Sequence, residues 1–194
     1  AVDIGQEVVD LGLQEPIVST ERTAKFQAGI VVAATVKRIA GLEVVREAIR
    51  VSHRVQEVPE INGFWIDGAF KPAGDVHIGV AISLRQGGLV APAIHDADKQ
   101  GLDELMRNML DLVKRARAGV LRASEVSDAT LTVTNLGEQG VQMVFGVIYP
   151  PQVALVGFGK LSEQAWAADG MVSARPVLAA SLAADHRVSD GHRG

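Results

Sequence analysis

Near the end of the chain, a histidine lies between two acidic residues. His186 directly follows Asp185, and Asp190 comes shortly after it, ahead of Gly191. A neutral imidazole is the side chain best suited to accept a proton near neutral pH, and a nearby carboxylate can fix its tautomer. The spacing alone is also typical of a solvated histidine at a strand end. A general base and an ordinary surface histidine are therefore both open interpretations of the pattern.

A second polar pattern is the row of hydroxyls in residues 129–134. Thr130, Thr132 and Thr134 alternate with apolar residues, so one face of a strand would carry all the hydroxyls. Threonine is common in half-buried strands, and β-propensity alone accounts for this row.

Other histidines are weaker candidates for chemistry. His77, His95, Asp96 and Asp98 offer metal-ligand types, but aspartates after a strand are ordinary turn and cap residues. His53 lies in a predicted helix, where we expect a partly exposed structural residue rather than a metal ligand. The chain has no cysteine, which excludes disulfides, thiolate catalysis and cysteine metal sites. We therefore expect no metal site.

Composition narrows the class of protein. The 194 residues are 47% hydrophobic, enough for one sizeable core, and the net charge of −4 is spread along the chain. We expect neither a nucleic-acid partner nor a membrane partner, because no basic block and no apolar run of ~18 residues is present. We also expect no signal peptide and a cytoplasmic protein, or one of the mitochondrial matrix if eukaryotic.

The elements that would position these residues follow from hydrophobic periodicity and turn signals. An apolar run over 177–184 predicts a buried strand that delivers His186 at its end. Residues 24–40 fit a strand or a helix equally well, and 1–24 are not diagnostic. The remaining predictions are helices over 42–58 and 102–118, strands over 64–66, 76–83, 89–94, 129–134 and 153–157, and tight turns at Asp67-Gly68 and Gly87-Gly88.

A longer segment around His186 resembles a known family. Residues 181–191 are similar to the D-H-R-x-x-D-G signature of the dihydrolipoamide acyltransferases, the core components of 2-oxo acid dehydrogenase complexes. Chloramphenicol acetyltransferase has the same fold and a related H-x-x-x-D motif. Further matching segments occur in the expected order over residues 42–191. They are P-E-x-N-x-x-W at 59–65, I-G-V-A, G-G-L-V-x-P and H-D-A-D within 75–98, T-x-T-N-x-G at 132–137 and the P-P-Q turn at 150–152.

The resemblance implies an α+β fold. It would be a chloramphenicol acetyltransferase-like two-layer fold, with a mixed β-sheet flanked by helices, in a trimer. We expect residues 1–194 to be a single acyltransferase core domain whose first 41 residues match the family poorly. The chain starts without methionine, which is typical of a fragment. It ends where the family continues into a last helix, so two interpretations stay open: the helix is missing, or the chain is a divergent member of the family.

The resemblance also implies acyl transfer between dihydrolipoamide and coenzyme A. His186 would be the general base, Thr134 would donate to the oxyanion, and Asp190 would hold local geometry through an ion pair. Asp185 and Arg187 would be structural. The histidine and the hydroxyl would come from adjacent subunits of a homotrimer, so that a monomer would be inactive.

Coenzyme A would enter as the acyl-CoA substrate, and the lipoyl group would be carried on a separate domain. The family builds its trimers into cubic or dodecahedral cores that bind a decarboxylating dehydrogenase and dihydrolipoamide dehydrogenase. Two alternatives stay open: a small-molecule O-acetyltransferase of the chloramphenicol acetyltransferase type, and a non-catalytic core subunit that scaffolds partner enzymes. The T-N-L-G and P-P segments favour the lipoyl-linked reaction over the former. Intact His186, Asp190 and Thr134 argue against the latter, whereas the weak match of the N-terminal residues argues for it.

Overall fold

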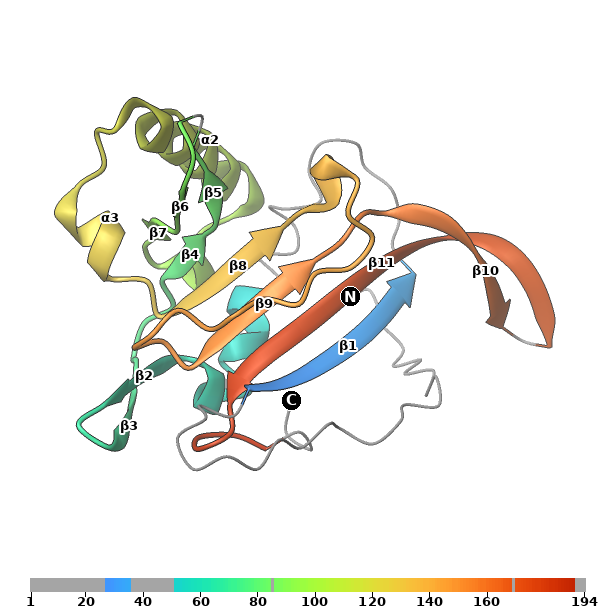
Figure 1. The fold of residues 1–194 in the computed structure, drawn as a ribbon, viewed down its shortest axis with the longest axis horizontal. Helices are drawn as coiled ribbons and strands as arrows, with labels where there is room; N and C mark the ends of the chain where they lie inside the picture. The colour runs from blue at the N-terminus through green and yellow to red at the C-terminus, as the bar shows by residue number, and fades with distance from the viewer. Residues whose placement is uncertain (1–26, 36–50, 85, 169, 191–194) are drawn as a thin grey trace.

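A mixed β-sheet forms the centre of the computed structural model, which describes residues 27–35, 51–84, 86–168 and 170–190. The strand order is β1-β11-β9-β8-β4-β7, as Figure 1 shows. β4, β8 and β9 run parallel, whereas β11 is antiparallel to both of its neighbours and β7 is antiparallel to β4. The bounds are β1 Gln27–Thr35, β4 Ile78–Val80, β7 Ala93–Ile94, β8 Leu131–Asn135, β9 Ala154–Phe158 and β11 Met171–Asp185.

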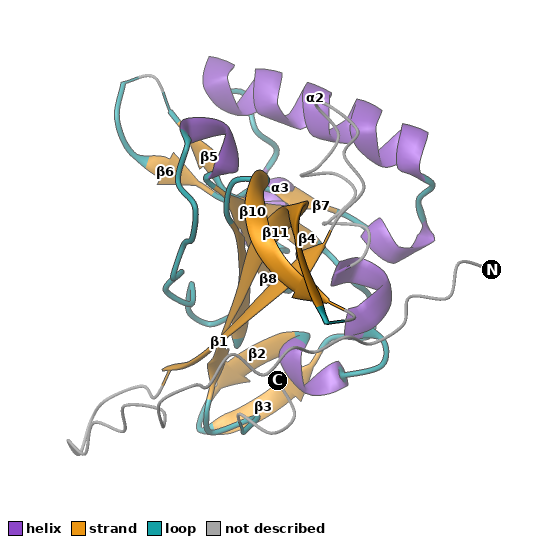
Figure 2. Cartoon of the chain, turned by 90° about the vertical axis from the view of Figure 1, so that its right-hand side faces the viewer, coloured by secondary structure: helices purple, strands orange, loops and turns teal. Residues whose placement is uncertain are grey.

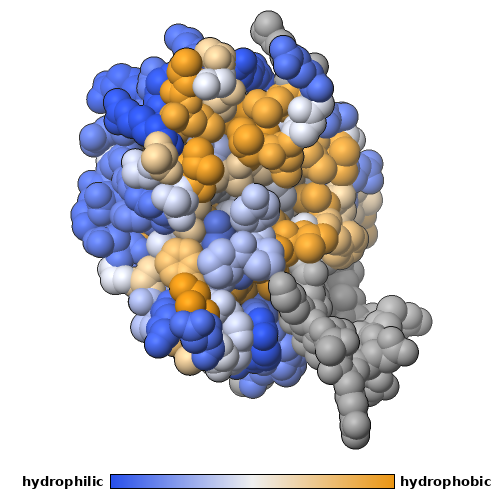
Figure 3. Space-filling view, turned by 60° about the vertical axis from the view of Figure 1, so that its left-hand side comes forward, coloured by the Kyte–Doolittle hydropathy of each residue, from blue (hydrophilic) through white to orange (hydrophobic). Residues whose placement is uncertain are grey.

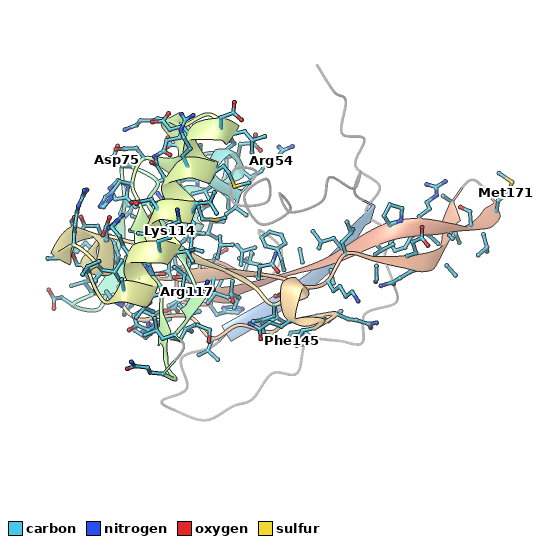
Figure 4. The ribbon with its side chains drawn as sticks, turned by 90° about the horizontal axis from the view of Figure 1, so that it is seen from above. Arg54, Asp75, Lys114, Arg117, Phe145 and Met171 are labelled. Atoms are coloured by element: carbon cyan, nitrogen blue, oxygen red, sulfur yellow. The ribbon has the colours of Figure 1, made fainter. Side chains whose placement is uncertain are left out.

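Three antiparallel pairs extend beyond this row of strands. β2 (Gly63–Ile66) and β3 (Ala69–Pro72) form a hairpin at the sheet end where β11 finishes, and β5 (Ile82–Ser83) pairs with β6 (Leu89–Val90). The β2–β3 turn has positive φ at both Asp67 and Gly68, as the Asp-Gly signal predicted. β10 (Ser162–Ala168) pairs with the first half of β11, and this hairpin projects from the body with Met171 at its tip (Figure 4).

The helices cover one face of the sheet. Residues 51–55 are helical, α2 spans Leu102–Ala118 and α3 spans Ala123–Ser127. α2 has the predicted bounds and ends at Gly119, whose φ of 72° is the left-handed conformation that glycine adopts without strain. Its apolar stripe packs on alternate residues of the strands, which makes one continuous core. The core includes Leu105, Leu112 and Ala116 from α2 and Ile78, Leu131, Val133, Phe158 and Leu178 from the sheet.

The opposite face is covered by the irregular segment 141–149, which runs along β9. Figure 2 views the sheet nearly edge-on, with α2 lying across its upper end. The Ser181 hydroxyl donates to the Val144 carbonyl at 2.5 Å. A Cβ on Gly157 would lie 2.6 Å from Val144 and 2.7 Å from the Ser181 hydroxyl. Glycine is therefore required there for the segment to approach the sheet.

The structure differs from the sequence predictions at two places. The strands predicted over 76–83 and 89–94 are each broken, and β5 and β6 leave the main sheet. Pro92 lies at the second break, where its missing N–H cannot join a ladder. The β10–β11 hairpin was not predicted, because alanines, serines and charged residues give it little hydrophobic alternation. Residues 27–35 form a strand, which resolves the ambiguity there, whereas residues 42–50 of the predicted helix lie outside the described residues.

A buried ion pair joins α2 to α3. The Glu125 carboxylate accepts from the Arg115 guanidinium and, at 2.8 Å, from the Arg122 backbone N–H. The Glu125 side chain is only 6% exposed, whereas Asp111, which also pairs with Arg115, is 64% exposed. The Arg115 guanidinium lowers the pKa of Glu125 below its ordinary value of 4.5.

Glu125→Gln is expected to lower the free energy of unfolding by about 2 kcal/mol at pH 7, because charge-assisted hydrogen bonds are lost in a buried place. A lowered carboxyl pKa stabilises the fold above the unfolded value and stops doing so as pH falls through the folded value. The difference between wild type and variant should therefore shrink below pH 4.5. Urea unfolding at several pH values measures it. Asp111→Asn is the control and should cost less than about 0.5 kcal/mol.

Candidate active site

His186 lies in a turn that begins where β11 ends. β11 finishes at Asp185, and His186 follows as an exposed residue. The Asp185 carbonyl accepts from the N–H groups of Val188 and Ser189 at 2.9 and 3.1 Å, and this closes the turn. His186 is therefore carried as an exposed residue on a hydrogen-bonded turn at the end of an inner strand of the sheet.

The two residues beside His186 are tied to each other. The Asp185 carboxylate accepts from Nε and Nη2 of Arg187, with a distance of 2.9 Å from Nε to Oδ1, and from the Arg187 backbone N–H at 3.0 Å. This ion pair raises the pKa of the Arg187 guanidinium. The guanidinium carbon also lies 4.2 Å from the ring centroid of Trp65 in β2. Asp185 and Arg187 thus make structural contacts, as predicted.

Asp190 is exposed at the end of the described residues. Its carbonyl accepts from the Ser189 hydroxyl at 3.4 Å. An ion pair between Asp185 and Arg187 lies in the same turn. The ion pair predicted for Asp190 stays a prediction.

The threonine row of β8 divides into structural and open hydroxyls. Thr130 bonds to both the N–H and the carbonyl of His77, and buried Thr132 donates to the Gln152 side-chain oxygen at 2.7 Å. Thr134 is half-buried, and its hydroxyl has no hydrogen-bond partner among the described residues. Thr134 is therefore the hydroxyl of the row that is available to a ligand.

The turn after Thr134 is closely packed. The Asn135 side-chain oxygen accepts from the Gly137 N–H at 2.7 Å, and a Cβ on Gly137 would lie 2.5 Å from the Gly159 carbonyl oxygen. In the T-N-L-G sequence, the asparagine thus forms an Asx turn, and the glycine has no side chain that would clash with this packing.

The strand register separates Thr134 from the histidine turn. Thr134 pairs with Gly157, which pairs with Ser181 of β11, so Thr134 is level with a residue well before Asp185. The offset is about 13 Å along β11 and about 10 Å across the strands, which gives about 16 Å in total. One chain therefore does not bring the Thr134 hydroxyl and the His186 ring to one reacting atom.

The His77 and His95 region is a structural cluster. The two rings meet edge to face at 4.9 Å, His77 Nδ1 accepts from the Asp96 N–H at 3.1 Å, and His95 Nε2 lies 3.1 Å from the Asp128 carboxylate. The Ser127 hydroxyl, followed by His95, lowers the pKa of Asp128. No group of residues in the described part of the chain is arranged to hold a metal ion.

A pocket of about 150 Å³ adjoins the histidine turn. It is mainly apolar, with one ion pair in its wall. Its lining consists of Trp65, Val147, Ile148, Pro150, Pro151, Gln152, Asp185 and Arg187. Sequence reasoning missed the contact between Trp65 and Arg187, because the two residues are far apart in the chain. The available signal for Trp65 was its place as the aromatic residue of the P-E-x-N-x-x-W motif.

Comparison with known proteins identifies the family. Residues 31–194 match the model of the 2-oxoacid dehydrogenases acyltransferase (catalytic domain) family. The chain belongs to this family. The match begins before residue 42 and includes residues 31–35 of β1. None of the helices in the described ranges is long and apolar enough to cross a membrane.

Two relatives show how far the similarity extends. The chain is 35% identical over 146 residues to the dihydrolipoyllysine-residue acetyltransferase component of the pyruvate dehydrogenase complex of Rickettsia bellii, covering 75% of this chain and 35% of that protein. It is 38% identical over 117 residues to the dihydrolipoyllysine-residue succinyltransferase component of the 2-oxoglutarate dehydrogenase complex of Rickettsia felis, covering 60% and 29%. The chain thus spans about a third of the length of the curated relatives it matches.

Solved structures share the fold. The dihydrolipoamide acetyltransferase of Azotobacter vinelandii has a TM-score of 0.77 and 26% identity, with 86% of this chain and 76% of that chain covered. A structure of the cubic core of the pyruvate dehydrogenase multienzyme complex has a TM-score of 0.76 and 27% identity, with the same coverage. For the Azotobacter protein, the roles of a serine, a histidine and an asparagine in the catalytic mechanism have been investigated.

The different hydrogen bonding of Thr132 and Thr134 predicts different losses in the free energy of unfolding when each residue is replaced by valine. Thr132→Val should lower the free energy of unfolding by about 1–3 kcal/mol, because the buried Gln152 oxygen loses its donor. Thr134→Val should change it by less than about 0.5 kcal/mol, since no partner is lost. Chemical unfolding of both variants measures the difference, and an equal loss in both would contradict the assignment of the hydroxyls.

Proposed function

We propose that this domain transfers an acyl group between dihydrolipoamide and coenzyme A, with His186 as general base and Thr134 as oxyanion donor. The supporting observation is the match between these residues and the Azotobacter enzyme. Its serine precedes its histidine by as many residues as Thr134 precedes His186, and its asparagine follows at the same interval as Asp190. At these spacings, this chain has a threonine where that enzyme has its serine and an aspartate where that enzyme has its asparagine.

The chemistry starts with a thiol that is largely protonated. A free thiol has a pKa of about 8.5, so only a small fraction is thiolate at neutral pH. His186 Nε2 or Nδ1 removes the thiol proton as the sulfur attacks the thioester carbonyl, which becomes a tetrahedral oxyanion. The Thr134 hydroxyl donates to that oxyanion. When the intermediate collapses, the leaving thiolate takes the proton back from the imidazolium, so the histidine is regenerated.

Asp190 acts on geometry in this proposal. It follows the hydrogen-bonded turn directly, where a carboxylate can restrain the segment behind His186 without touching substrate. The acyl group is proposed to be acetyl, because the acetyltransferase relative matches more of the chain than the succinyltransferase relative does.

A complete site is proposed to need two copies of the chain, in a homotrimer. The separation of about 16 Å between Thr134 and the histidine turn supports this arrangement. In a cyclic assembly, the same two surfaces meet at every interface, so each interface would join one copy's Thr134 to the next copy's His186.

An exposed apolar stripe offers the surface for such an assembly. Large side chains alternate along the segment 141–149 and point outward, from 37% exposed at Val141 to 75% at Val147. The stripe begins beside Leu136, whose carbonyl accepts from the Val141 N–H, and ends at the pocket beside Arg187. Figure 3 shows hydrophobic surface gathered into a patch, and Figure 4 places Phe145 on the side of the sheet away from Lys114 of α2. The stripe consists of Val141, Met143, Phe145, Val147 and Tyr149.

Larger assemblies follow from the same proposal. The trimers are proposed to build a multienzyme core, and the partners are a decarboxylating dehydrogenase and dihydrolipoamide dehydrogenase. The solved cubic core with the same fold supports this part.

His186→Ala is expected to lower acyl transfer from acetyl-CoA to dihydrolipoamide by about 10²–10⁴-fold, because the thiol loses its base. Thr134→Val should lower it by about 10²–10³-fold, because the oxyanion loses one donor. The assay follows coenzyme A release, with succinyl-CoA as the competing donor. A folded, assembled wild type without transfer would instead support a scaffold subunit.

Mixing the two inactive variants tests whether each site is shared between copies. If His186→Ala and Thr134→Val chains are unfolded and refolded together, random trimers regain about one quarter of wild-type activity, since that fraction of interfaces joins an intact histidine to an intact threonine. Each variant refolded alone is the control. Mixed samples that stay as inactive as the controls would place both groups within one chain.

Phe145→Lys is expected to reduce the oligomer mass and the activity together, because a charge would be buried in the stripe. Light scattering coupled to size-exclusion chromatography measures the mass. Val126→Lys in α3 is the matched control, since Val126 is 65% exposed but lies outside the stripe. An unchanged mass for Phe145→Lys would show that the stripe is not the interface.

A further inference from the structure

We propose that Trp65 is a positioning residue for His186, acting through Arg187. This inference rests on the proposed function, because it assigns a role in setting the general base. Trp65 belongs to the β2–β3 hairpin, which lies beyond the end of the central sheet in Figure 1. Its ring face meets the Arg187 guanidinium at 4.2 Å, and Arg187 is the residue that follows His186.

The indole is itself held against the sheet. The backbone N–H of Trp65 donates to the Pro151 carbonyl at 2.8 Å, and the neighbouring residue, Phe64, forms an isolated β-bridge with Gln152. Gln152 is buried and accepts from Thr132 of β8. Two backbone contacts therefore connect the hairpin to the segment 151–152, and the Gln152 side chain continues the connection to β8, so the strand that carries the ring is held in place beside Arg187.

The guanidinium links this surface to the turn. Nε and Nη2 of Arg187 bond to the two oxygens of Asp185, and the Asp185 N–H donates to the Val153 carbonyl at 2.8 Å. The Asp185 side chain is 7% exposed, whereas the Arg187 side chain is 40% exposed and has the indole over one face. His186 thus lies between one residue anchored in the sheet and one residue held between Asp185 and Trp65.

The consequence for catalysis is geometric. A general base has to lie within hydrogen-bond reach of the proton that it removes, and small displacements of a reacting group are costly in rate. Without the aromatic face, Arg187 keeps its pair with Asp185 but loses its restraint on the solvent side. The turn then gains freedom, and the ring of His186 spends less time in the productive orientation.

The test compares Trp65→Leu, Trp65→Phe and the control Trp166→Leu, which replaces the tryptophan of the projecting β10–β11 hairpin. Trp65→Leu is expected to lower kcat about tenfold, with KM for both substrates within about twofold of wild type, because a cation–π contact contributes up to about one order of magnitude. Trp65→Phe should retain most of the activity, since phenylalanine also offers a ring face. Trp166→Leu should match wild type.

A second measurement reports on the ring without activity. In protein labelled with ¹³C-histidine, the His186 Cε1–Hε1 signal is assigned by its absence in His186→Ala. It should move and broaden in Trp65→Leu, return toward its wild-type position in Trp65→Phe, and stay in place in Trp166→Leu. Arg187→Lys supplies the same test if Trp65→Leu fails to fold, because lysine keeps the charge and removes the two-pronged contact with Asp185.

The inference is overturned if kcat and the His186 signal are both unchanged in Trp65→Leu, or if Trp65→Phe loses as much activity as Trp65→Leu. A rise in KM with kcat unchanged would also overturn it, since that result assigns Trp65 to substrate binding. A wild type with no acyl transfer refutes the proposed function, whereas a displaced His186 signal in Trp65→Leu would still support the positioning role.

Discussion

The hydrogen-bonded register of β8, β9 and β11 is the constraint on which the rest of this domain depends. It determines that Thr134 and the end of β11 lie at different levels of the sheet, and it puts alternate residues of each strand on opposite faces. Phe158 and Leu178 belong to the core under the helices, whereas Leu155, Gly157 and Ser181 face the segment 141–149. A shift by one residue would exchange these two sets and bury polar groups against α2.

The polar groups of the site are fixed in different ways. Asp185 is bonded within its own turn and to Arg187, and Thr132 is bonded across the sheet. The two proposed reacting groups differ from these neighbours, because His186 is exposed and Thr134 has no hydrogen-bond partner in the described ranges. Among these groups, the Thr134 hydroxyl is therefore the one that is open to substrate, and His186 is distinguished by its exposure. The contact between Trp65 and Arg187 shows how a distant hairpin takes part in this arrangement.

Much of this could be predicted from local sequence. α2 was predicted with its observed bounds, because a regular apolar stripe, acidic first-turn residues and Gly119 all agree. The β2–β3 turn and the strand leading to His186 have equally local signals. The β10–β11 hairpin has none, since its residues project into solvent and its alternation is weak. Whether Thr130, Thr132 or Thr134 is hydrogen-bonded depends on partners distant in the chain, such as Gln152. Periodicity alone therefore could not predict which of the three hydroxyls is open.

The offset between Thr134 and the histidine turn has a consequence for how such a domain is regulated in time. In the proposed arrangement, a newly folded chain carries every reacting group and yet is inert, because the partners for each half of its chemistry lie on another molecule. Activity then begins with assembly, and dilution below the dissociation constant of the assembly removes it without unfolding any domain. The spacing of strands in one sheet thereby links the onset of catalysis to the concentration of the protein.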